Sequence, residues 1–374
     1  FMSKLVSGQA IIQEFESWSK KKYAEEGDPI GLQVGSLNKK IKKVMTALDV
    51  LPNVVEEAVN EGVDLIIAHH PILYRPLKKI NLDTAQGKMI ETLIKHDITV
   101  YAAHTNLDVA PGGVNDMLAE ALGLKDTTVL VETFKRELKK VVVFVPASHQ
   151  EEVRNALANA GAGSIGEYSD CTFTFQGTGR FKPTDYAKPF IGEAGALEAV
   201  DEVKIESVFY ADQQATIINA IKKAHPYEEV AYDIYPLDNE PEKLGLGRIG
   251  QLETEMTLES FAGFVKEKLG AGGVRIVGDL QSTIKKVAVL GGDGNKFINA
   301  ARFSGADVFI SGDIYYHVAH DAMIEGLQII DAGHNIEKIM IDGVRKKLLA
   351  FLEEKRYETE IISSQEKTDP FQFR

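Results

Sequence analysis

Cysteine is almost absent from this sequence of 374 residues, in which Cys171 is the only one. A single thiol excludes an intramolecular disulfide framework and a cysteine-rich zinc site, and it fits a reducing cytosol. Long apolar runs are also missing, since no segment approaches the ~20 residues that a membrane span needs. The first ten residues show no cationic region followed by a long apolar stretch, so we expect no secretory signal. These absences predict a cytoplasmic protein without membrane association.

Positive charge is in deficit, because 42 lysines and arginines face 55 aspartates and glutamates, which gives a net charge of −13. Non-specific binding of nucleic acid depends on neutralising phosphates with Lys and Arg, so this balance disfavours a nucleic-acid partner. Net charge does not describe how the charges are distributed, and a local basic patch stays open. The apolar fraction of 44% and the charged fraction of 26% are those of an ordinary globular protein.

Strand and helix patterns alternate along the first 130 residues. Near-continuous apolar segments at 41–50, 63–70 and 98–104 predict strands, and the segments 51–62 and 84–97 predict helices between them. Apolar strands separated by helices are typical of a parallel sheet that is covered on both faces. The sequence therefore predicts an α/β fold for this region.

The last 130 residues repeat this pattern, and residues 43–70 align without a gap to residues 286–313. Identical residues occupy these pairs of positions: Lys43/Lys286, Val44/Val287, Gly62/Gly305, Asp64/Asp307 and Ile67/Ile310. A third pair of strands, 98–104 and 328–334, then places His104 opposite His334. Chance similarity between two α/β segments is the alternative, but the unbroken register favours an internal duplication.

The middle of the chain, residues 131–245, has a different order of predicted elements. Strand, helix, strand, strand, helix and strand follow one another, which is the βαββαβ order of the ferredoxin-like fold. A stretch with Pro and Gly, residues 239–250, marks its exit. We expect residues 1–130 and 246–374 to form one α/β domain that is interrupted by this insert.

Four of the nine histidines, His69, His70, His104 and His334, stand at the C-terminal ends of predicted parallel strands. Ligands of open α/β sheets bind just outside those ends. Carboxylates lie close by in the sequence: Asp108 follows His104 by four residues, Glu337 follows His334 by three, and Asp313 and Asp331 also lie near strand ends. The sequence predicts that these groups meet at one sheet edge.

Imidazole and carboxylate groups without thiolates suit zinc, manganese, iron or nickel. About five such ligands exceed those of one open zinc site and indicate two metal ions about 3.5–4 Å apart. A lone histidine at a strand end is more often a packing or capping residue. The pair His69–His70 before Pro71 favours ligation, because two buried imidazoles are costly without partners. His104 stays open as a ligand, an acid–base group or a residue that orients Asp108.

Other segments give weaker signals. The motif GGDGNK at 291–296 could hold a phosphate or form a tight turn, and Arg180 in QGTGRFKP could bind an anion. His317 and His320 share one face of a predicted helix, and His317 could line a pocket. His225 in AHPYEE ends a predicted helix and is interpreted as structural or as part of a subunit contact.

Four motifs in this order, GLQVG, DLIIAHHP, YAAHTNLD and DAGHNIEK, resemble the NIF-three-like family, also called GTP cyclohydrolase I type 2 homologues. The resemblance covers both outer blocks, and the insert with AHPYEE resembles that of the longer members and PII/CutA-type modules. It implies an α/β/α sandwich with a pseudo-repeat, a toroidal homohexamer and a dinuclear site whose ligands are His69, His70, Asp108, His334 and Glu337. Many short members space the last pair by four residues, and here the spacing is three.

Two functions follow as expectations. One is a metal-dependent hydrolase acting on a nucleotide or a phosphorylated small molecule, in which His104 transfers a proton. The cofactors would be two divalent ions, zinc first and manganese or iron as alternatives. The other function is a non-enzymatic, metal-binding regulatory or scaffold protein, in which the insert senses a ligand or supports oligomerisation.

Overall fold

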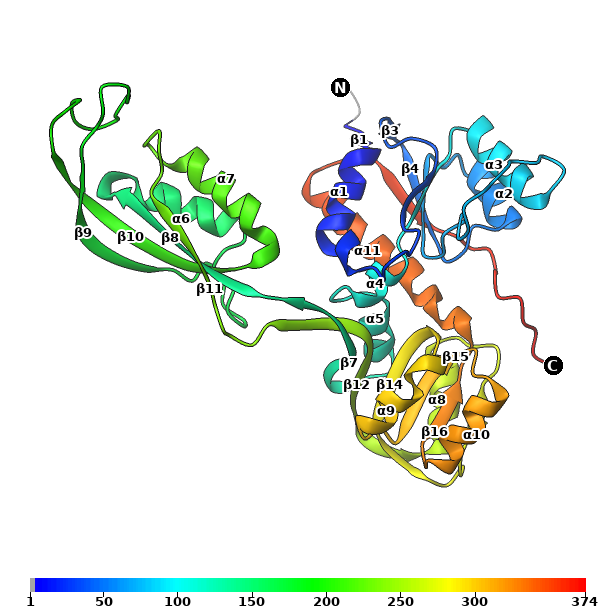
Figure 1. The fold of residues 1–374 in the computed structure, drawn as a ribbon. Helices are drawn as coiled ribbons and strands as arrows, with labels where there is room; N and C mark the ends of the chain where they lie inside the picture. Colours follow the sequence, from blue (N-terminus) through cyan, green and yellow to red (C-terminus); the bar gives the residue numbers. More distant parts are fainter. Residues whose placement is uncertain (1–3) are drawn as a thin grey trace. The chain divides into compact units, whose positions relative to one another are not determined.

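The computed structural model describes residues 4–374 as two compact units. Unit 1 contains residues 4–134 and 244–374, and unit 2 contains residues 135–243, which are drawn in green in Figure 1. The sequence places the boundaries of the insert at 131 and 245. Residues 1–3, which belong to the stretch searched for a secretory signal, lie outside the described residues. Between residues 4 and 374, no helix is long and apolar enough to cross a membrane.

Unit 1 contains two main sheets, and the expected α/β fold class is confirmed. In the sheet called here the N-terminal sheet, the strands lie in the order β17 (Glu360–Ser363), β4 (Lys43–Ala47), β5 (Leu65–Ala68), β6 (Thr99–Ala102) and β2 (Gly31–Val34). The first four are parallel, and β2 is antiparallel to β6. The short strands β1 (Val6–Ser7) and β3 (Lys40–Ile41) pair separately.

The sheet called here the C-terminal sheet has the order β13 (Arg275–Val277), β16 (Gln328–Asp331), β15 (Val308–Gly312), β14 (Thr283–Asp293), β12 (Glu242–Thr257) and β7 (Lys125–Arg136). Its centre, β14–β15–β16, is parallel, and β13 and β12 are antiparallel additions. The parallel centres of both sheets therefore come from the two copies of the predicted duplication.

The duplication explains one identical pair, Asp64 and Asp307. The carboxylate of Asp64 accepts hydrogen bonds from the backbone N–H groups of residues 42 and 43, and that of Asp307 accepts from residues 285 and 286. Each aspartate thus anchors the backbone at the equivalent position of its copy. The third strand departs from the predicted alignment by one residue: Leu65 pairs with Thr99 and its counterpart Val308 pairs with Gln328, so His104 corresponds to Gly333 and not to His334.

Helices cover both faces of each sheet, which confirms the α/β/α arrangement. The outer face of the N-terminal sheet carries α2 (Pro52–Asn60) and α3 (Ala85–Lys95), and that of the C-terminal sheet carries α9 (Ile298–Phe303) and α10 (Tyr316–Ile324). The inner faces share one core with α1 (Gly8–Trp18), α5 (Val114–Ala121), α8 (Leu258–Lys268) and α11 (Ile339–Glu354). Burial on both faces is why the central strands are continuously apolar. The shorter helices are α4 (Thr105–Val109), η1 (Lys21–Tyr23), η4 (Asn295–Phe297) and η5 (His334–Lys338).

Unit 2 has the predicted ferredoxin-like topology. Its elements are β8 (Leu138–Pro146), η2 (Ala147–His149), α6 (Gln150–Asn159), β9 (Phe173–Phe181), β10 (Glu198–Tyr210), η3 (Ala211–Gln213), α7 (Gln214–Ala224) and β11 (Tyr232–Pro236). The strand order β11–β8–β10–β9 is antiparallel throughout. Alternate residues of β8 and β10 face α6 and α7 in a separate apolar core.

Candidate metal centre

The two adjacent histidines His69 and His70 follow directly after β5, where the backbone N–H groups of both still bond to residues 47 and 48 of the neighbouring chain segment. Pro71 then ends the pairing, because proline has no N–H to donate. The two ring centroids are 5.1 Å apart, and both rings face the space around Glu337, whose Oε2 atom lies 3.0 Å from Nε2 of His70 and 3.7 Å from Nε2 of His69. His104, after β6, and His334, in η5, approach this space from two further segments.

Each of the four imidazoles has its Nδ1 atom bound to an acceptor outside the cluster. His69 Nδ1 meets the carbonyl oxygen of Ala103 at 2.8 Å. The other three meet carboxylates: His70 with Asp49 at 2.6 Å, His104 with Asp28 at 2.9 Å and His334 with Asp313 at 2.7 Å. A proton held on Nδ1 leaves the lone pair of Nε2 free. This carboxylate–histidine pattern is the one that orients histidine ligands of metals.

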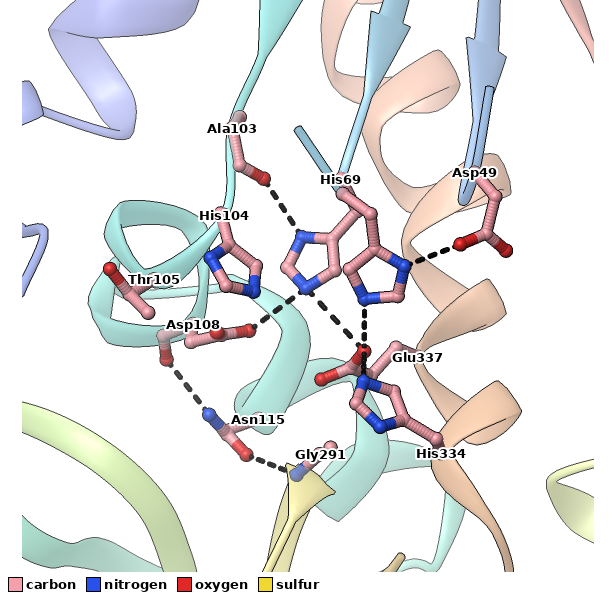
Figure 2. A network of polar contacts seen from close by, with 12 residues as sticks. Asp49, His69, Ala103, His104, Thr105, Asp108, Asn115, Gly291, His334 and Glu337 are labelled. Carbon is pink, nitrogen blue, oxygen red and sulfur yellow. Dashed lines mark hydrogen bonds and ion pairs between the residues drawn. The ribbon is translucent and has the colours of Figure 1, made fainter. Parts of the chain in front are cut away.

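The Nε2 atoms converge on two buried carboxylates, Glu337 and Asp108 (Figure 2). The Oε2 atom of Glu337 lies 3.0 Å from Nε2 of His70, 3.2 Å from that of His334 and 3.7 Å from that of His69. The Oδ1 atom of Asp108 lies 3.5 Å from Nε2 of His69. Two groups of potential ligands result, one with His69 and Asp108 and one with His70 and His334, and both include Glu337.

Two buried atoms of this cluster, Nε2 of His69 and Oδ1 of Asp108, have no hydrogen-bond partner. Leaving such groups unpaired in a protein interior is costly. Ligands about 2.1 Å from a tetrahedral ion lie roughly 3.4 Å from one another, and the distances around Glu337 and Asp108 scatter about that value. The residues therefore fit a divalent metal ion, which would give the unpaired atoms a partner.

The pKa values of the potential ligands show that protons compete with a metal ion for the metal-free cluster. Burial opposes a charge on His70, but its hydrogen bonds with Asp49 and Glu337 outweigh burial and raise its pKa to about 10. The hydrogen bond with Glu337 raises the pKa of His334 to about 9. Burial raises the pKa of Asp108 to about 6. The imidazoles must lose these protons before they can bind a metal.

The three-residue spacing of His334 and Glu337 is explained by local structure. Both residues lie in the 3₁₀ turn η5, in which side chains at i and i+3 eclipse each other, so one turn presents both groups to the cluster. Asp313, which holds His334, has a positive φ of 58°. Such backbone strain in a non-glycine residue often accompanies a functional site.

The motif GGDGNK connects β14 to η4, as the tight-turn interpretation expects, and its first two glycines have a further role. A Cβ atom on Gly291 would lie 3.0 Å from Cγ of Glu337, and one on Gly292 would lie 2.8 Å from Oε1 of the same side chain. The two glycines therefore make room for Glu337. The backbone N–H of Gly291 also donates to Asn115, whose amide donates to the carbonyl oxygen of Asp108 (Figure 2).

All six predicted site residues lie in this cluster, including His104, whose side chain forms a third potential ligand group with His69 and His70. Sequence reasoning missed the supporting groups Asp28 and Asp49, and it noted Asp313 only as a strand-end residue. Asp49 follows the end of β4 closely, which is the one signal that could have found it.

The weaker candidates lie elsewhere. Arg180 belongs to β9 of unit 2, and His317 and His320 belong to α10 on the outer face of the C-terminal sheet. In unit 2, Nε2 of the buried His225 donates to the carbonyl oxygen of Phe144, and its Nδ1 accepts from the N–H of Tyr227. Both nitrogens of His225 are used within the fold, which makes this residue structural.

Comparisons with known proteins agree with this architecture. Residues 6–370 match the family model described as Duf34/NIF3 (NGG1p interacting factor 3). The chain is 58% identical over 372 residues to the GTP cyclohydrolase 1 type 2 homolog of Bacillus subtilis (strain 168), covering 100% of both proteins. It matches the crystal structure of a Bacillus cereus protein related to NIF3 with a TM-score of 0.93, at 57% identity and with 100% of both chains covered. A Staphylococcus aureus structure matches with a TM-score of 0.75, at 32% identity and with 99% of both chains covered. The family model and these relatives span essentially the whole sequence, and the chain therefore belongs to the Duf34/NIF3 family.

Proposed function

We propose that the protein is a metal-dependent hydrolase that acts on a nucleotide or another phosphorylated small molecule. The observation that carries the proposal is the pair of ligand groups that share Glu337 beside a cavity of about 400 Å³ lined by His70 and His334. The name of the Bacillus subtilis relative, a homologue of a GTP cyclohydrolase, supports a nucleotide as substrate.

Charge supports two divalent ions in the proposed site. Five carboxylates, Asp28, Asp49, Asp108, Asp313 and Glu337, surround imidazoles that are neutral when they act as ligands. Two divalent ions, with zinc first and manganese or iron as alternatives, would nearly balance this negative charge. When bound, such a pair of ions supplies Lewis acidity and lowers the pKa of a water molecule toward neutrality. His69 and Asp108 would hold one ion, His70 and His334 the other, and Glu337 both.

His104 is the proposed proton carrier. Its Nδ1 atom is held by Asp28, whose pKa is lowered by the hydrogen bonds with His104 and Thr105 against the opposing effect of burial. Asp28 therefore stays a carboxylate and stabilises the positive imidazole that forms when Nε2 takes up a proton. A histidine so held can accept a proton from the attacking water and return it to the leaving group.

A second candidate is a non-enzymatic, metal-binding regulator or scaffold, in which unit 2 senses a ligand or supports assembly. Unit 2 favours it, because β9 is an edge strand with exposed Phe173 and Phe175 and could pair with another chain. We also propose that the chain assembles into a homohexamer. Exposed apolar residues on α10, Tyr316, Met323 and Ile324, support contacts between copies.

The test combines metal analysis with turnover of GTP and a panel of phosphoesters. We expect metal loss and inactivity in His69→Ala and His334→Ala, because each removes a ligand from one group. His104→Ala should retain most of the metal and lose turnover by ~100-fold or more. The matched control is His317→Ala, on the outer face of the C-terminal sheet. Wild-type metal content in both ligand variants would reject the site, and metal-loaded protein without turnover would favour the regulatory alternative.

A further inference from the structure

The cavity beside the candidate metal centre has two chemically different walls. One wall is formed by the centre itself, through His70, His334 and their partners Asp49 and Asp313. A second wall comes from the segment 368–373, which follows β17 of the N-terminal sheet. A volume of about 400 Å³ lies within the range of small-molecule sites.

The segment 368–373 is attached to the centre by a specific contact. The hydroxyl of Thr368 donates to Oδ2 of Asp49 at 2.5 Å, and Oδ1 of the same carboxylate holds His70. The next residues form a fixed turn, because Asp369 accepts a hydrogen bond from the N–H of Phe371 at 3.0 Å and Pro370 restricts the backbone between them. The position of Phe371 relative to the metal ligands is therefore set by the chain.

Phe373 is placed by a second contact, with the loop between α8 and β13. A Cβ atom on Gly272 would lie 2.6 Å from the ring of Phe373, and one on Gly273 would lie 2.3 Å from it. Only glycine allows the ring to approach this loop so closely. Two independent contacts thus fix the backbone at Phe371 and the ring of Phe373 beside one cavity.

Both phenylalanines are solvent-exposed, Phe371 to 67% and Phe373 to 53%. Large apolar surfaces held in place in a cavity wall gain free energy when a ligand buries them, and aromatic rings gain most from another planar ring. Lys338, which also lines this cavity, adds a cationic group that suits an anionic ligand.

We propose that Phe371 and Phe373 bind the planar ring of a phosphate-bearing substrate whose phosphate end is held at the metal centre. This inference rests on the proposed function and names its substrate class: an anion that carries an aromatic heterocycle, of which a nucleotide is the simplest example. The segment 368–373 selects for the ring, and the centre selects for the charged end.

The test measures binding to the zinc-loaded protein by calorimetry, with guanosine 5′-monophosphate and inorganic phosphate as probes. The nucleotide should bind about ten-fold or more tightly than phosphate, which is the scale of one base stacked on an aromatic side chain. Phe371→Ala and Phe373→Ala should each reduce this advantage without changing the affinity for phosphate or the zinc content. Phe371→Tyr should preserve it. Phe303→Ala, which alters a phenylalanine that is 76% exposed at the end of α9, is the control.

Three outcomes would overturn the inference. The first is equal affinity of the wild-type protein for both probes. The second is an unchanged preference for the nucleotide over phosphate in both alanine variants. The third is a change of molecular mass by light scattering in either variant, because the phenylalanines would then form a subunit contact. Turnover is measured separately. Binding that depends on the ring, without turnover, would reject the hydrolase and support ring binding by Phe371 and Phe373. Turnover that is unchanged in both variants would support the hydrolase and reject ring binding by these residues.

Discussion

At the scale of single residues, the candidate centre depends on carboxylates that never face the proposed metals. Asp49 holds Nδ1 of His70 at 2.6 Å and accepts the hydroxyl of Thr368 on its other oxygen. Replacing it by asparagine keeps the shape but lets an amide N–H face the imidazole, which favours the wrong tautomer. We expect Asp49→Asn to reduce zinc affinity by about 10–100-fold, the usual effect of losing such a partner. Competition titration against a chromogenic chelator measures this change.

The matched control for Asp49→Asn is Asp307→Asn, which alters an aspartate that bonds to the backbone N–H groups of residues 285 and 286. We expect this control to reduce thermal stability and to leave zinc affinity unchanged. Equal zinc affinities of Asp49→Asn and the wild-type protein would mean that Asp49 does not orient a ligand.

Protonation gives a second prediction at this scale. With pKa values of about 10 for His70 and about 9 for His334, both imidazoles are protonated on both nitrogens and positively charged at pH 7 in the metal-free protein. Zinc binding must release these protons, and zinc affinity should rise with pH until the pH passes these pKa values. Calorimetry in buffers of different ionisation enthalpy should show a binding heat that depends on the buffer. A heat that is independent of the buffer at pH 7 would contradict the protonated state.

Residue patterns predict the centre only in part. The four histidines, Asp108 and Glu337 could be predicted because each follows a recognisable strand, and ligands bind beyond the C-terminal ends of parallel strands. The expectation of one sheet edge was wrong: His69, His70 and His104 follow strands of the N-terminal sheet, and His334 follows β16 of the C-terminal sheet. Asp28 could not, since it lies 76 residues from the histidine that it holds and belongs to no predicted element. Such partners depend on the final approach of loops, for which the sequence contains no periodic signal.

At the scale of elements, the C-terminal end of β14 sets the position of Glu337. Gly292 has a φ of 74°, and a Cβ there would lie 2.8 Å from Oε1 of Glu337 and 3.5 Å from Nε2 of His334. Gly292→Ala should therefore displace these groups and reduce bound zinc by at least half in metal analysis. Gly305→Ala is a strain-matched control, because Gly305 also has a φ of 74° and its Cβ would meet only the end of Lys286, at 3.7 Å.

Both glycine variants should lose about 1–2 kcal/mol of folding free energy, the penalty of a left-handed conformation for a residue with a Cβ. Only Gly292→Ala should also lose metal. If the two variants bind zinc equally well, then Gly292 serves only the backbone conformation at the end of β14 and does not make room for Glu337.

Element prediction succeeded where the pattern was local. The strands β4, β5, β14 and β15 and the helices between them could be predicted from apolar runs and from the duplication. The strand β17 could not, because it pairs with β4 across more than 300 residues and its four residues carry no long apolar run. The one-residue shift of β6 against β16 was also missed, because the intervening segments differ in length and only strand pairing sets the register.

At the scale of the whole molecule, the metal centre and the insert belong to different units. Every predicted site residue lies within 4–134 or 244–374, and the apolar core of unit 2 contains only residues of unit 2. The strands β7 and β12, which lead into and out of the insert, are neighbours in the C-terminal sheet, and Arg136 pairs with Glu242 at their ends at 2.7 Å. A two-residue turn could therefore close this pair of strands.

We predict that replacing residues 137–241 by Asn-Gly, a turn that suits adjacent antiparallel strands, leaves unit 1 folded and able to bind the wild-type amount of zinc. The reason is that unit 1 keeps its sheets and helical layers, and no ligand group is removed. Metal analysis and calorimetric melting of the shortened chain measure the result. Retained zinc with retained turnover would place the chemistry in unit 1 and leave unit 2 to regulation or assembly. Loss of zinc or of a cooperative transition would instead show that the centre requires the insert, which the separation of their apolar cores argues against.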